Sequence, residues 1–218
     1  MYEPILSRRL LAEIFDLNLA FTHLLERGDV SMAVSGLGMT LVERIARLPR
    51  PALEDLCGCP FPLFGLRFDD LDFWHAVREA RPSYKYAVRP AEVRANSEPT
   101  QQAFALLALF YAWHLTSTNP IAARLCFGLP PAAARIFRSL PVSELLSVAT
   151  HSPGLLHAQF DDNPSFWADL MEIVESGDRR RLCAARILGT QLLGAHCAER
   201  AGRIRRMAAR RRHDRPQG

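Results

Sequence analysis

Apolar residues recur at steps of three and four along the first part of the chain, with polar residues between them. This spacing predicts a helix with one apolar face. The helix is expected to end at Arg27-Gly28-Asp29, where glycine suits a C-terminal turn and Asp29 can cap the next helix. The apolar face consists of Leu6, Leu10, Ile14, Leu17, Phe21 and Leu24.

Shorter apolar segments separated by glycine and proline follow. A short helix is expected from about Val30 to Ser35, stopping at Gly36-Leu37-Gly38. Thr40-Leu41-Val42-Glu43 has the pattern of a capping box, in which hydroxyl and carboxylate bond otherwise orphan amides. Pro51 suits the first turn of another helix, where its missing amide costs nothing. Phe61 to Phe68 then has the pattern of an extended apolar piece.

The same pattern occurs a second time. Shifting the numbering by 92 places a second copy on Ile14 to Asp70 without a gap, and bends match as well as apolar positions. The chain is therefore predicted to contain two similar modules. The clearest matches are Leu17 with Leu109, Phe21 with Trp113, Gly36-Leu37 with Gly128-Leu129, Leu48-Pro49 with Leu140-Pro141, Phe68-Asp69-Asp70 with Phe160-Asp161-Asp162 and, one residue later, Phe73-Trp74 with Phe166-Trp167.

Prolines and scattered polar residues separate the two copies, which predicts a linker. The first helix of the second copy, from about Gln101 to Leu115, is apolar nearly all round, which predicts burial between the modules. Pro130-Pro131 opens the helix that Thr40 opens in the first copy. A last amphipathic helix contains Leu182, Ile187, Leu188, Leu192 and Leu193. The predicted division is residues 1–80 for the first module, 81–100 for the linker, 101–198 for the second module and 199–218 for a basic tail.

Charge is distributed unevenly along the chain. Residues 178–218 contain twelve arginines against three acidic residues, a net charge of +9, whereas the whole chain carries +4, so residues 1–177 carry −5. A basic end on a slightly acidic body is typical of contact with a polyanion. The alternative is a solvated basic end that docks an acidic protein. The candidate DNA-binding residues are Arg200, Arg203, Arg205, Arg206, Arg210, Arg211 and Arg212.

The sequence gives no sign of a membrane protein. No run approaches the ~20 apolar residues of a membrane helix, and the first residues lack the order of a signal peptide. The five cysteines form no disulfide framework. We therefore expect a cytoplasmic protein.

Catalytic chemistry has little support in the sequence. Cys57-x-Cys59 lacks the second pair of ligands that a zinc site needs, so turn or core cysteines are the favoured interpretation. Asp69-Asp70 and Asp161-Asp162 are candidate general acid/base groups or metal ligands. Each pair precedes a helix, however, and helix capping is favoured. His114 and His157 lie among apolar residues, where a core imidazole is expected, and no nucleophile motif or phosphate loop is present.

Three segments, in this order and at similar spacings, resemble the FlhD family, the small subunit of the bacterial flagellar master regulator. The resemblance covers residues 10–75 well and residues 102–195 more loosely, through the internal repeat. The segments are Glu13-Ile14-Phe15-Asp16-Leu17-Asn18-Leu19-Ala20-Phe21, Gly36-Leu37-Gly38-Met39 and Leu66-Arg67-Phe68-Asp69-Asp70.

This resemblance implies an all-α protein that interlocks through helices and activates transcription with a partner of the FlhC type. In the family that partner carries much of the DNA contact and a zinc site. Because one chain holds two FlhD-like modules, we expect an intrachain pseudo-dimer. The candidate residues of the interface between modules are Ile14, Leu17, Phe21, Leu24, Phe104, Leu106, Leu109, Phe110 and Trp113.

The sequence departs from the family at two points. Phe64 occupies the position of a family cysteine that can bridge subunits, and the second copy has Leu106-Leu107-Ala108-Leu109-Phe110 instead of the D-x-N-L signature. We expect a non-catalytic regulatory subunit without a cofactor that reaches double-stranded promoter DNA within a complex. The alternative is a protein-interaction adaptor or sequestering module that does not contact DNA.

Overall fold

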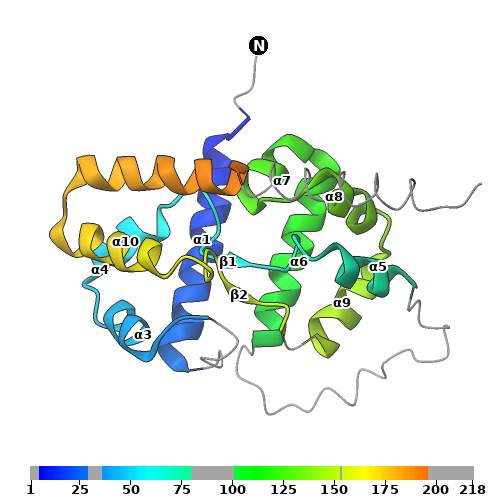
Figure 1. Ribbon diagram of the computed structural model, residues 1–218, viewed down its shortest axis with the longest axis horizontal. Helices are drawn as coiled ribbons and strands as arrows, with labels where there is room; N and C mark the ends of the chain where they lie inside the picture. The colour runs from blue at the N-terminus through cyan, green and yellow to red at the C-terminus, as the bar shows by residue number, and fades with distance from the viewer. Residues whose placement is uncertain (1–4, 29–35, 80–100, 153, 196–218) are drawn as a thin grey trace, which may run out of the picture.

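Helices dominate the described part of the chain, as the sequence predicts (Figure 1). The computed structural model describes residues 5–28, 36–79, 101–152 and 154–195. A final helix covers residues 179–195, up to the last described residue, and is called helix 179–195 here. The preceding elements are α1 (Arg8–Arg27), α3 (Met39–Ala46), α4 (Arg50–Cys57), β1 (Phe64–Gly65), α5 (Leu71–Glu79), α6 (Gln101–Thr118), α7 (Pro120–Phe127), α8 (Pro131–Arg138), α9 (Val142–His151), β2 (His157–Ala158) and α10 (Pro164–Ser176).

The order of elements in the first half recurs in the second. The starts of α3 and α8, and of α4 and α9, are 92 residues apart, and those of β1 and β2, and of α5 and α10, are 93 apart. Backbone details recur too: Gly36 and Gly128, 92 residues apart, have φ of 71° and 59°, while Arg67 and Phe160, 93 apart like the strands, have φ of 52° and 61°. The extra residue of the second copy therefore comes before β2, so the predicted match of Phe68-Asp69-Asp70 with Phe160-Asp161-Asp162 is wrong by one residue. A left-handed φ is uncommon outside glycine, so its recurrence at matched positions shows that the two copies follow similar paths.

Three helix ends are those that the sequence predicts, at Gly28, Pro51 and Asp70, whereas the cap at Ser7 was not predicted. The Ser7 side chain caps α1 by accepting from the Leu10 amide at 3.2 Å, and Gly28 ends the helix with φ of 72°. Pro51 lies in the first turn of α4. Asp70 caps α5, because its Oδ1 accepts from the Phe73 amide at 2.9 Å.

Two of the capping predictions are wrong. The predicted capping box fails because α3 already begins at Met39, which places Thr40 inside the helix, and the N-cap Gly38 has no side chain to contribute. In the second copy, α10 begins at Pro164 after Asn163. The extra residue of that copy moves Asp162 one position away from the cap, so the pair Asp161-Asp162 does not repeat the role of Asp70.

In each half, the helix that follows the strand packs on the other half. α5 packs against α8, and α10 packs against α3 and α4. Between them α1 and α6 are in contact, and β1 pairs antiparallel with β2 through Phe64 opposite Ala158 and Gly65 opposite His157 (Figure 1). Because the two halves bury each other's apolar faces, their buried residues form one continuous core.

Some predictions fall outside the described residues. These are the cap Asp29, the helix from Val30 to Ser35, the linker 81–100 and the tail 199–218. No helix among the residues that the structure describes combines the length and apolarity needed to cross a membrane.

Candidate functional site

The predicted interface residues on α1 all lie in the core, whereas those on α6 divide. Of the α6 residues, Leu106 and Trp113 are half-buried, and Phe110 is 36% exposed. Leu107 beside it is 54% exposed, so α6 turns one apolar side to solvent instead of being covered all round. The buried candidates are Ile14, Leu17, Phe21, Leu24, Phe104 and Leu109.

Aromatic rings join the halves at the strand pairing. The Phe104 ring of α6 lies 4.9 Å from the Phe64 ring, nearly perpendicular to it, and 5.9 Å from the Phe21 ring of α1. Edge-to-face pairs of this kind add roughly 0.5–1.5 kcal/mol to the gain from burial. Phe64 is fully buried in this cluster, so it contributes apolar packing between the halves.

Asn18 is the clearest polar element of the core. Its Nδ2 donates to the carbonyls of Cys57 and Phe61 at 3.1 and 3.0 Å, and its Oδ1 accepts from the Leu63 amide at 2.8 Å. The fully buried side chain thus satisfies three backbone groups of the segment that leads from α4 to β1. The sequence offered one signal for this role: Asn18 lies four residues after Ile14 on the buried face of a helix.

Other polar contacts across the halves were not anticipated from the sequence. Tyr111 of α6 donates its hydroxyl to Glu13 of α1 at 3.0 Å, and burial together with this carboxylate raises the pKa of Tyr111. Arg44 of α3 makes a two-bonded ion pair with Glu175 of α10, at 3.0 and 2.8 Å, which lowers the pKa of Glu175. Since the pair is about one-third exposed, it sets the relative position of the helices more than it stabilises them.

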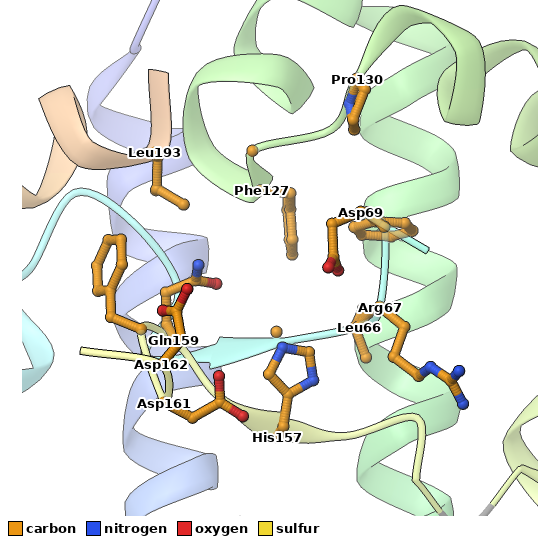
Figure 2. Close-up of a pocket in the computed structure, with 14 residues that line it drawn as sticks. Leu66, Arg67, Asp69, Phe127, Pro130, His157, Gln159, Asp161, Asp162 and Leu193 are labelled. Carbon is orange, nitrogen blue, oxygen red and sulfur yellow. The ribbon is translucent and has the colours of Figure 1, made fainter. Parts of the chain in front are cut away.

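A small polar cavity of about 110 Å³ lies beside the strand pairing, between the two halves (Figure 2). Its walls include Arg67 and Asp69 from the first half and His157, Asp161 and Asp162 from the second. The volume is below the roughly 300–1,000 Å³ of typical small-molecule pockets but large enough for water. The cavity therefore suits water between the polar residues of the two halves better than it suits a substrate.

The His157 ring lies close to the backbone of β1. A Cβ placed on Gly65, its partner in the pairing, would be only 2.3 Å from His157 Nε2, so the glycine makes room for the ring. Burial lowers the pKa of His157, against the opposing influence of Asp161. The expected core imidazole is found only in part at His157, which is half-buried and lines the polar cavity, whereas His114 is exposed and that expectation was wrong.

The surroundings of Cys57, Cys59 and Asp70 favour structural roles over catalysis or metal binding. Burial raises the pKa of Cys57 to about 11 and that of Cys59 to about 12, which suppresses the thiolate that a metal or nucleophilic role requires. Burial also acts on Asp70, but the Phe73 amide and Arg67 outweigh it and hold the pKa of Asp70 below its ordinary value. Within the described residues, no three His, Cys, Asp or Glu side chains are grouped to hold a metal ion.

The candidate DNA-binding arginines, Arg200 to Arg212, lie outside the described residues. Comparison of the chain with models of protein families, with curated proteins and with solved structures finds no match.

Proposed function

We propose that this protein is a non-catalytic, FlhD-like regulatory subunit that acts with an FlhC-like partner on promoter DNA. The observation that supports the proposal is the exchange of the helices that follow the strands, in which α5 packs on α8 and α10 packs on α3 and α4. Two subunits of an interlocked dimer that are fused into one chain would have this arrangement. Such a chain would arrive at its partner already dimerised, without a concentration-dependent self-association step.

The basic tail supplies the attraction to DNA in this proposal. Seven arginines between positions 200 and 212 can each neutralise a phosphate, with little dependence on sequence. The net charge of −5 on residues 1–177 repels DNA, so the tail would hold the duplex while the body binds the partner.

The test measures binding of the complex with an FlhC-like protein to a promoter duplex at several salt concentrations. Replacing the seven arginines by glutamine is expected to weaken binding and to flatten the salt dependence by about 0.9 per lost phosphate contact. Replacing them by lysine keeps the charge and should retain most of the slope. If the glutamine variant binds DNA with the same affinity and the same salt dependence as the original chain, the tail does not contact DNA.

The second candidate is an adaptor that binds a regulator without contacting DNA. The acidic balance of residues 1–177 favours it, because a folded body of this charge gains nothing near a phosphate backbone. Stable association with the partner but no binding of the complex to DNA at low salt would select the adaptor.

A further inference from the structure

Helix 179–195 presents an uncharged apolar face to solvent. Between Leu182 and Ala195 its only charged residue is Arg186, which turns inward and donates to the Asp55 carbonyl at 2.5 Å. On the outward side Ile187 and Leu188 are 55% and 51% exposed. Cys183 and Ala184, one turn earlier, are also exposed, and these four residues are called the outer stripe: Cys183, Ala184, Ile187 and Leu188.

The inner side of the same helix is already occupied. Leu182 and Leu193 are buried there, and a Cβ on Gly189 would lie 2.3 Å from the Phe61 ring. Turning the helix to cover the outer stripe would expose these leucines and break the close approach at Gly189. Figure 1 shows the helix along the outer edge of the molecule, which agrees with the exposure of Ile187 and Leu188.

Charge at the end of the helix indicates what that molecule is. Arg179 and Arg180 are exposed beside the outer stripe, and Arg181 next to them bonds Glu172 at 3.2 Å. The sequence after the helix adds further arginines from Arg200 onward. Helix 179–195 contains no acidic residue, so a second copy paired through this helix would offer no carboxylate to Arg179 and Arg180. Complementarity therefore favours an acidic occupant.

We propose that the outer stripe is the docking site for an acidic amphipathic helix of a partner protein. Apolar residues of that helix cover Ile187 and Leu188, while its carboxylates face Arg179 and Arg180. This inference rests on the proposed function for the existence of a partner. Its test needs neither DNA nor an FlhC-like protein, so the two proposals can fail separately.

Two labelled peptides of about 18 residues, long enough to form a helix, serve as probes. Both carry the same leucine seam, flanked by glutamate in one and by lysine in the other. Fluorescence anisotropy should show binding of the glutamate peptide and weaker binding, by about tenfold or more, to the Ile187→Asp protein. The matched control is Ile121→Asp on α7, at an isoleucine that is 57% exposed. This variant should bind the glutamate peptide with the same affinity as the original chain.

A second measurement uses the thiol inside the outer stripe and needs no change to Ile187. In a Cys197→Ser chain, Cys183 is the one exposed cysteine among the described residues, since Cys57, Cys59 and Cys126 are buried. The glutamate peptide should slow its alkylation. Equal peptide affinity for the Ile187→Asp protein, equal binding of the lysine peptide, or unprotected Cys183 would each overturn the proposal. Self-association that Ile187→Asp abolishes would overturn it in favour of a second copy.

Discussion

The indole of Trp74 lies 5.1 Å from the ring of Phe137, with the two planes at 68°, although the residues belong to opposite halves of the chain. Trp74 comes from α5 and Phe137 from α8, and both are fully buried. Phe68 stacks on the indole at 5.5 Å, and Trp74 Nε1 donates to the Arg67 carbonyl at 2.8 Å. The main apolar residue of the first half's last helix therefore stabilises the second half.

This contact predicts that the halves unfold together. Trp74→Ala should lower the free energy of unfolding by about 3–5 kcal/mol, because it leaves a cavity between α5 and α8. Urea unfolding followed by circular dichroism should show one transition shifted to lower urea. The exposed substitution Leu107→Ala should change the stability by no more than about 0.5 kcal/mol. Two transitions, with only one moved by Trp74→Ala, would show that the halves are independent.

Asn18 offers a comparison between the two copies. Asn18→Ala leaves three buried backbone groups without a partner and should cost about 2–4 kcal/mol of stability. Phe110 occupies the matching position in the second copy and is 36% exposed, so Phe110→Ala should cost less than about 1 kcal/mol. Thermal unfolding of both variants measures the two losses of stability. Similar losses would mean that the hydrogen bonds of Asn18 contribute little.

Local features of this fold could be predicted from the sequence because short-range rules govern them. The spacing of Ile14, Leu17 and Phe21 gave the buried face of α1, and Gly28 gave its end. The matched glycines Gly36 and Gly128 marked bends that the structure holds in the left-handed region. Thr40 shows the limit, since a capping motif has no effect when the helix begins one residue earlier.

Contacts between distant residues could not be predicted in this way. Periodicity shows that α5 has an apolar face but not that this face packs on the other half. Arg186 and Asp55 are 131 residues apart, and nothing in their local sequence indicates the bond. The exposure of the outer stripe could not be predicted either, because Leu182 and Ile187 fit one amphipathic pattern although the first is buried and the second exposed. Which side of such a helix is covered depends on the rest of the fold.

Gly65 and His157 should behave as a coupled pair. Gly65→Ala places a methyl group in the space of the imidazole, so we expect a loss of about 1–3 kcal/mol, as for other overpacked sites. Adding His157→Ala should recover part of this loss, which a double-mutant cycle measures. Gly154→Ala is the control, because nothing lies within 4 Å of the added carbon and Gly154 caps no helix. Strictly additive losses at positions 65 and 157 would contradict the contact.

The half-buried imidazole of His157 also predicts a pH dependence of stability. Because burial lowers the pKa of His157 below its ordinary value of 6.5, the unfolded chain binds a proton more readily than the folded one. Stability should therefore fall as the pH drops below about 6.5, until the pH reaches the folded pKa, where the loss is complete. Asp161, Asp162 and Arg67 are the charged groups that act on the ring, the aspartates opposing the shift and the arginine adding to it.

Urea unfolding of the original chain and of His157→Gln, measured between pH 7 and pH 5, checks this prediction. The glutamine cannot take up a proton, so the variant should lose less stability over this range than the original chain. The pKa values of Asp70 and Glu175 are lowered from 3.8 and 4.5, so these groups lose their contributions to stability in more acidic solution. They therefore do not account for a loss of stability between pH 7 and pH 5. The exposed substitution His114→Gln should keep the steeper loss of the original chain. An identical pH dependence for His157→Gln and the original chain would mean that the imidazole of His157 is not the group that titrates.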